Sequence, residues 1–141
     1  MLFDDNLKST LVPIAKRFGI KLLMVHGSYA KGTASPKSDL DIAFLCYGSD
    51  IEFGELLELQ GELEKLFTFP GEIDLHSLHK VDSLFLFEVA KCGILLVGDK
   101  NDYDDFRLHA LARYEDTREL RMLERKLIDK QQNRWRTKYG Q

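Results

Sequence analysis

The sequence predicts an α/β fold, a short mixed β-sheet flanked by helices, with a C-terminal helical extension. Two short apolar runs, Lys21–Gly27 and Asp39–Tyr47, have the length and composition of strands. Segments with apolar residues at helical spacing surround them, and from residue 101 the pattern becomes that of a long charged helix. We place the core at 1–100 and the helical extension at 101–141, and we expect the helices of the core on one side of the sheet.

The N-terminal part is predicted to begin with a helix over Asp5–Phe18, where apolar residues recur at helical spacing. Gly19 suits its C-terminal cap, and Pro13 predicts a kink or a later start. The first strand follows and ends at a glycine. The segment Ser28–Ala34 is expected to open a short helix, and the second strand comes after a polar loop.

The second half of the core continues the alternation of helix and strand. Glu52–Phe69 repeats apolar residues at helical spacing and predicts a helix. Glu72–Leu78 alternates and predicts a third strand. Ser83–Cys92 is expected to be helical up to Gly93, and Ile94–Val97 adds a short strand.

The helical extension is predicted to start near Asn101 with Asp102 as its N-cap. An unbroken helix to Arg134 would span roughly 50 Å at about 1.5 Å per residue, which is long for a small body. We therefore expect a break near Thr117.

The segment Arg118–Lys138 contains eight Lys/Arg and three Asp/Glu residues in a chain of net charge −3. Such a basic tail on an acidic body indicates either a partner surface or a solvated helix face. Leu120, Leu123 and Leu127 form one helical stripe, which requires a packing partner in the body or in another chain.

Composition excludes several classes of protein. The chain has 141 residues, 44% hydrophobic and 30% charged, which is typical of one globular domain and not of a disordered chain. It contains no apolar run near the roughly 20 residues of a membrane helix and no secretory signal pattern. The net charge argues against direct nucleic-acid binding. Cys46 and Cys92 lack metal-ligand spacing and are expected to be reduced residues of a cytoplasmic protein.

Two aspartates close the polar loop between the first two strands. Asp39 and Asp41 are one residue apart, so their side chains point to the same face of a strand. Adjacent carboxylates raise each other's pKa unless a cation lies between them, and Mg²⁺ prefers such oxygen ligands. Asp74 lies on the third predicted strand. If that strand pairs with the second, these residues form an acidic triad, Asp39, Asp41 and Asp74, able to hold two metal ions.

The other end of the loop has the features of a phosphate site. Gly27 allows close approach to the backbone, and Ser28 offers a hydroxyl and an amide at a helix start. Lys31 either contacts phosphates or faces water, and Ser38 is either a ligand contact or a local cap. The loop is therefore predicted to hold a triphosphate at one end and its metals at the other.

Three histidines lie near these segments. His76 and His79 have no cysteine partner and a spacing unlike that of zinc ligands, which argues against a zinc site. His26 is expected to be a core residue beside the glycine turn.

The spacing Gly27-Ser28, ten residues, Asp39-Leu40-Asp41 resembles the nucleotidyltransferase signature of the DNA polymerase β superfamily. The stretch GSYAKGTASPKSDLDI resembles the version in minimal nucleotidyltransferases, with Lys31 where arginine is commoner. Residues 88–129 resemble the C-terminal half of the antitoxins paired with HEPN-domain ribonucleases, through the pattern Phe106, Ala110, Tyr114 and Asp116.

This resemblance implies AMP transfer from Mg-ATP to a tyrosine hydroxyl of a cognate HEPN ribonuclease toxin, which silences it. The acidic triad would hold two Mg²⁺ ions, and Gly27 with Ser28 would hold the β and γ phosphates. Oligomerisation is expected mainly with the toxin, and no membrane contact is expected. Two alternatives stay open: nucleotidyl transfer to a small molecule such as an aminoglycoside, and an antitoxin that acts by binding alone.

Overall fold

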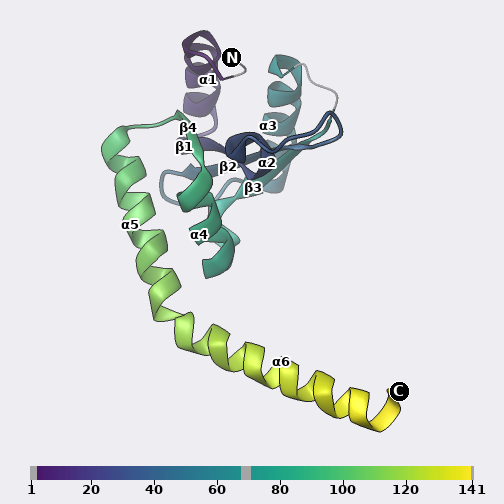
Figure 1. Cartoon of the computed structure of the whole chain (residues 1–141). Coiled ribbons are helices and arrows are strands. Elements are labelled where there is room, and N and C mark those ends of the chain that lie inside the picture. Colours follow the sequence, from purple (N-terminus) through teal and green to yellow (C-terminus); the bar gives the residue numbers. More distant parts are fainter. Residues whose placement is uncertain (1–2, 68–70, 141) are drawn as a thin grey trace.

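The computed structural model describes residues 3–67 and 71–140. Its core is a four-stranded mixed sheet with the strand order β3-β2-β1-β4 (Figure 1). The elements are α1 (Asp5–Arg17), β1 (Ile20–His26), α2 (Gly27–Lys31), β2 (Leu40–Cys46), α3 (Phe53–Leu66), β3 (Ile73–Ser77), a 3-10 turn (Leu78–Lys80), α4 (Ser83–Cys92), β4 (Ile94–Val97), α5 (Lys100–Asp116) and α6 (Arg118–Tyr139). The predicted order of helices and strands is confirmed. Phe69, the predicted end of α3, lies outside the described residues.

The sheet combines antiparallel and parallel pairing. Strand β1 is antiparallel to both β2 and β4, whereas β2 is parallel to β3. The parallel pair requires a crossover, which α3 supplies. Because of this topology, β1 ends where β2 and β3 begin, so the termini of these three strands meet at one end of the sheet.

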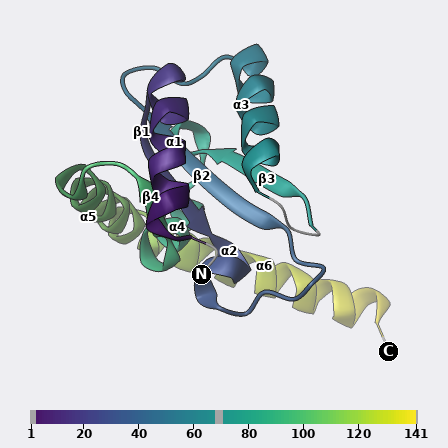
Figure 2. The same cartoon turned by 90° about the horizontal axis from the view of Figure 1, so that it is seen from above.

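Helices cover both faces of the sheet, so the expectation of helices on one side was wrong. Figures 1 and 2 show α1 and α3 on one face and α4 with α5 on the other. On the first face Leu23, Val25, Ile42 and Phe44 pack with Leu11 of α1 and Leu59 of α3. On the second, Leu22, Met24 and Ala43 pack with Leu86 and Val89 of α4 and Phe106 of α5. The physical reason is that the central strands are apolar on both sides, and a strand buried on both faces does not alternate.

Helix α1 starts at the predicted residue and continues through Pro13 to Arg17. The Asp4 carboxylate caps it by accepting a hydrogen bond from the Leu7 amide at 2.9 Å. Gly19 follows the helix with a φ of 67°, as expected for a helix C-terminus.

The N-cap of α5 is Asp99 and not the predicted Asp102. The Asp99 carboxylate accepts a hydrogen bond from the Asp102 amide at 3.3 Å. Asp102 instead lies in the first turn, where its carboxylate is 3.9 Å from Lys21 Nζ. The N-cap therefore lies three residues earlier than the charge pattern suggested, because Asp99 precedes Asp102 at the right spacing.

The predicted break at Thr117 is confirmed, since α5 ends at Asp116 and α6 begins at Arg118. Arg121 fixes this joint: its guanidinium donates to the Tyr114 carbonyl at 2.7 Å and to the Thr117 hydroxyl. It also lies over the Tyr114 ring at 3.8 Å. Beyond the joint α6 extends away from the body (Figure 1) and has no buried residue.

Of the helices described, none is long and apolar enough to cross a lipid bilayer. Among the described residues both cysteines are free, Cys46 in the core and Cys92 partly buried.

Candidate functional site

The sheet register brings together two carboxylates that are far apart in the sequence. Asp41 on β2 and Asp74 on β3 are direct partners in the parallel ladder. Asp39 lies just before β2, and its Oδ1 accepts a hydrogen bond from the Glu72 amide at 3.2 Å. The prediction that the third strand pairs with the second is therefore confirmed. The acidic triad lies at the end of the sheet where β2 and β3 begin.

Strand alternation decides which face carries these acids. Leu40 and Ile42, on either side of Asp41, are buried in the core beneath α1 and α3. Asp41 must therefore point to the opposite face, where Ala43 packs in the α4–α5 core. The site opens on the α4 side of the sheet.

The electrostatics of the triad favour a bound cation. Burial raises the pKa of the Asp41 carboxyl, and the nearby Asp74 carboxylate raises that pKa further. Within the described chain, the ion pairs of these acids are with His76 and not with Lys or Arg. Partly buried carboxylates that repel each other are the donor set that Mg²⁺ binds, so the residues present fit this ion.

Gly27 follows the last residue of β1 and lies directly beside Asp41 of the acidic triad. Its φ is 69°, a conformation that side chains disfavour. A Cβ at this position would collide with Asp41 Oδ2. Glycine is therefore required both for the turn and for the space beside Asp41. Ser28 follows in the first turn of α2, and its carbonyl accepts a hydrogen bond from the Gly32 amide that closes this short helix.

The two other predicted ligand contacts have local partners. Lys31 Nζ lies 3.9 Å from Glu88 Oε2, so it joins α2 to α4 at a half-exposed position. Ser38 Oγ accepts a hydrogen bond from the Ser35 amide at 2.8 Å, as its alternative role of local cap requires. Within the described residues, no hydrogen bond or ion pair joins either side chain to the acidic triad, and their ligand roles stay predictions.

Two histidines lie beside the acidic triad, and the sequence alone did not predict this position for either of them. His76 Nε2 lies 3.1 Å from Asp74 Oδ2 and 4.0 Å from Asp41 Oδ1. His26 is buried, as expected, and its ring centroid is 5.3 Å from that of His76. Burial, and then the charge of His76, lowers the pKa of His26 to about 4, so its imidazole is neutral at pH 7. One signal was available: His76 follows Asp74 by two residues and so shares its strand face.

His79 has a structural role in this fold. Its Nε2 accepts a hydrogen bond from the Cys46 amide at 2.9 Å. Nearby, Asp50 Oδ1 accepts from the Ser77 hydroxyl at 2.7 Å and from the Ile51 amide at 2.8 Å. These bonds connect the end of β2 to the end of β3.

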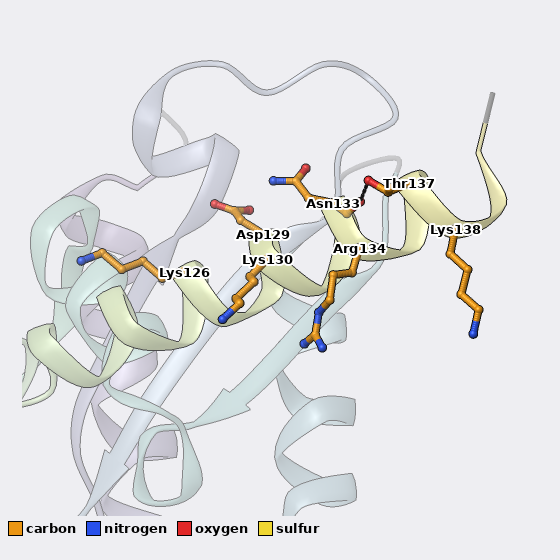
Figure 3. Close-up of a pocket in the computed structure, with 7 residues that line it drawn as sticks. All are labelled: Lys126, Asp129, Lys130, Asn133, Arg134, Thr137 and Lys138. Atoms are coloured by element: carbon orange, nitrogen blue, oxygen red, sulfur yellow. Dashed lines mark hydrogen bonds between the residues drawn. The ribbon is translucent and has the colours of Figure 1, made fainter.

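A basic hollow lies on α6, away from the sheet. Figure 3 shows that its side chains all project from this single helix. They are Lys126, Asp129, Lys130, Asn133, Arg134, Thr137 and Lys138. Among the described residues no second element lines this hollow, so it does not enclose a small ligand and belongs to an open helix surface.

The family model described as polymerase beta, nucleotidyltransferase matches residues 9–102 of the chain. No curated protein sequence matches the chain.

Solved structures with a similar fold include a toxin–antitoxin complex with AMP-PNP, at 22% identity and a TM-score of 0.70, covering 87% of this chain and 96% of that one. Another is a tri-AMPylated Shewanella oneidensis HEPN toxin in complex with an MNT antitoxin, at 20% identity and a TM-score of 0.65, covering 89% and 95%. A third is the toxin–antitoxin MntA–HepT, at 19% identity and a TM-score of 0.66, covering 90% and 97%.

Proposed function

Because the chain belongs to the polymerase β nucleotidyltransferase family, we propose that it transfers AMP from Mg-ATP to a tyrosine hydroxyl of a HEPN ribonuclease toxin and so silences that toxin. The observation that carries this proposal is the pairing of Asp41 with Asp74 beside Gly27. In this proposal the carboxylates would hold the metals and the glycine turn would hold the phosphates, side by side at one end of the sheet.

The similar structures support the choice of donor and acceptor. One of those complexes contains a non-hydrolysable ATP analogue, and another contains a toxin that carries AMP groups. The fold match spans 87–90% of this chain and 95–97% of those chains, so it includes more than the catalytic core.

In the proposed reaction the tyrosyl oxygen attacks the α-phosphorus of ATP. A new O–P bond forms, the bond from the α-phosphorus to the bridging oxygen breaks, and pyrophosphate leaves. Gly27 and Ser28 hold the β and γ phosphates through the close backbone approach that glycine permits. Asp39 and Asp41 would hold Mg²⁺, and Asp74 would join them and accept the tyrosine proton. Bound Mg²⁺ would supply neutralisation of the phosphate charge.

The toxin needs a docking surface, and we assign it to α6. Leu120, Leu123 and Leu127 are 65%, 53% and 56% exposed, so the body does not cover the leucine stripe. The same helix has a net charge of +5, with eight basic and three acidic residues. Two copies of α6 would repel each other, whereas an acidic partner surface with an apolar centre would match both properties. The partner expected on α6 is therefore an acidic face of the toxin.

The experiment is the intact mass of the partner toxin after incubation with this chain, ATP and Mg²⁺. Parallel samples contain the Asp39→Asn/Asp41→Asn variant and the Asp104→Asn variant, which changes an exposed acid of α5 outside the site. A mass gain in whole adenylate units with the wild type and Asp104→Asn, but not with the double variant, is expected.

Two other results would select the alternatives. Equal complex formation by all three proteins without a mass gain would mean that the chain acts by binding alone. Nucleotidyl transfer to an aminoglycoside in the absence of toxin, with no gain on the toxin, would assign a small-molecule acceptor.

A further inference from the structure

A second set of metal-ligand atoms lies beside the acidic triad and includes nitrogen donors. His26, Asp41 and His76 each offer one ligand atom, and these atoms all lie within 4.8 Å of one another. The three residues come from the adjacent strands β1, β2 and β3. Asp41 is the register partner of His26 on one side and of Asp74 on the other.

One nitrogen in this group lacks a partner. His26 is 8% exposed, and its Nε2 is buried without a hydrogen bond in the described part of the chain. Buried polar atoms of folded proteins nearly always have a hydrogen-bond or metal partner. The rings of His76 and Phe85 lie against it, with centroids 5.3 and 5.4 Å from that of His26. Neither ring contact provides a hydrogen bond to this nitrogen.

A second group of possible metal ligands in the described residues differs from the first because its members make hydrogen bonds within the protein. Cys46, Asp50 and His79 also place ligand atoms within 4.8 Å of one another. Their polar atoms, however, already have protein partners: His79 Nε2 accepts from the Cys46 amide, and Asp50 accepts from Ser77 and Ile51. The structure accounts for that cluster by hydrogen bonding alone. In the group around His26, His76 Nε2 lies 3.1 Å from Asp74 Oδ2, but within the described residues His26 Nε2 has no such partner.

We propose that His26, Asp41 and His76 form a binding site for a first-row transition-metal ion such as Zn²⁺ or Co²⁺. Two imidazoles and one carboxylate suit these ions, whereas Mg²⁺ favours oxygen ligands and retains its water. An ion at this position would engage the orphaned His26 nitrogen and also neutralise the Asp41 carboxylate. Since Asp41 also belongs to the acidic triad, the two kinds of metal compete for this side chain.

This site extends beyond the proposed AMP transfer and does not depend on it, because metal binding can be measured without ATP or toxin. The probe is Co²⁺, added to metal-free full-length protein and followed by its visible absorption. Zn²⁺ competition then gives the affinity for the colourless ion. The variants are His76→Gln and, as a matched control, His109→Gln on the exposed side of α5.

The expected result is one Co²⁺ per chain in the wild type and in His109→Gln. Binding should be at least tenfold weaker in His76→Gln, and millimolar Mg²⁺ should not remove the Co²⁺ from the wild type. His26→Phe gives an independent test, because phenylalanine fills the same space beside Phe85 without a ligand atom. Far-UV circular dichroism establishes that each variant is folded.

Three outcomes would overturn the proposal. The first is the absence of saturable Co²⁺ binding by the wild type. The second is equal binding by the wild type, His76→Gln and His26→Phe. The third is cobalt–thiolate absorption that persists in His76→Gln and in His26→Phe. This absorption would place the ion at Cys46, Asp50 and His79 instead.

Discussion

Asp41 and Asp74 are direct partners across two parallel strands, where like charges opposite each other destabilise the sheet. Leu40 and Ile73, the pair immediately before them, are fully or almost fully buried. The core beneath α1 and α3 thus holds the two strands in register and forces the two carboxylates together. Without a bound metal ion, the folded protein therefore contains two carboxylates that repel each other.

The first prediction concerns the stability cost of that repulsion. The pKa of Asp41 is raised above its unfolded value of 3.8, so its contribution to stability is complete below that pH and is lost as the pH rises through the folded pKa. Asp41→Asn removes the charge and should raise the free energy of unfolding of the metal-free protein at pH 7. Urea titrations with and without Mg²⁺ measure this effect.

Asp104→Asn is the control for Asp41→Asn, since it removes an exposed acid outside the site. Mg²⁺ should stabilise the wild type and Asp104→Asn more than Asp41→Asn. A less stable Asp41→Asn protein in the absence of metal would show that the carboxylate is already compensated within the fold.

The second prediction separates the two demands placed on Gly27. Gly27 and Gly32 have similar φ values, 69° and 75°, but only at Gly27 would a Cβ meet another side chain, that of Asp41. Gly32→Ala should cost about 1 kcal/mol in stability through backbone strain alone. Gly27→Ala should cost more and should also weaken ATP binding by at least tenfold.

Equilibrium unfolding and ATP-analogue titration of both glycine variants provide the comparison. Equal losses of stability with unchanged nucleotide affinity would mean that the approach of Gly27 to Asp41 has no role in the site.

The sequence allowed much of this site to be anticipated, and the reason is local. Asp39, Asp41 and Gly27 belong to one loop and its flanking strands, where spacing and turn chemistry are informative. Asp74 could be added only on the condition that its strand pairs with β2. The spacing of Asp74 and His76 places both on one strand face, but the approach of His26 and His76 to Asp41 depends on the register of three strands, which the sequence does not reveal.

The errors in the fold prediction have the same origin. That helices cover both faces of the sheet depends on tertiary packing, although the nearly continuous apolar run of β1 was a signal for it. The N-cap of α5 was misplaced because Asp99 and Asp102 are both acceptable capping residues, and only the hydrogen bond to the Asp102 amide distinguishes them.

The third prediction concerns the dependence of stability on pH. The pKa of His26 is lowered to about 4 from 6.5, so the unfolded chain takes up a proton before the folded protein does. The contribution of His26 is therefore fully present above pH 6.5 and is lost as the pH falls towards 4. The loss amounts to about 3 kcal/mol at most, at 1.36 kcal/mol per pKa unit.

His26→Phe should flatten the dependence of the unfolding free energy between pH 6.5 and 4, while His109→Gln should leave it unchanged. An identical slope for His26→Phe and the wild type would contradict the assignment of a neutral, buried imidazole.

The fourth prediction divides the acidic triad into a binding and a transfer role. Asp39→Asn should abolish transfer with the fold intact. Asp74→Asn retains two carboxylates for Mg-ATP and should bind the nucleotide within about threefold of the wild type, yet transfer AMP at least a hundredfold more slowly, since proton removal contributes on that order. Nucleotide titration and single-turnover kinetics distinguish the two variants, and normal turnover by Asp74→Asn would exclude it from the mechanism.

The fifth prediction addresses the leucine stripe on α6. Leu123→Asp/Leu127→Asp changes two exposed side chains of a helix that has no buried residue, so the stability of the chain should change by less than about 1 kcal/mol. Affinity for the toxin, measured by calorimetry with the full-length proteins, should fall at least tenfold because the substitutions remove apolar contact and add negative charge against an acidic surface. Leu108→Asp, at a leucine of α5 that is also more than half exposed, is the control and should bind normally. If the α6 variant bound the toxin as tightly as the wild type while Leu108→Asp did not, the docking surface would lie on α5, and the exposed stripe of α6 would have another partner.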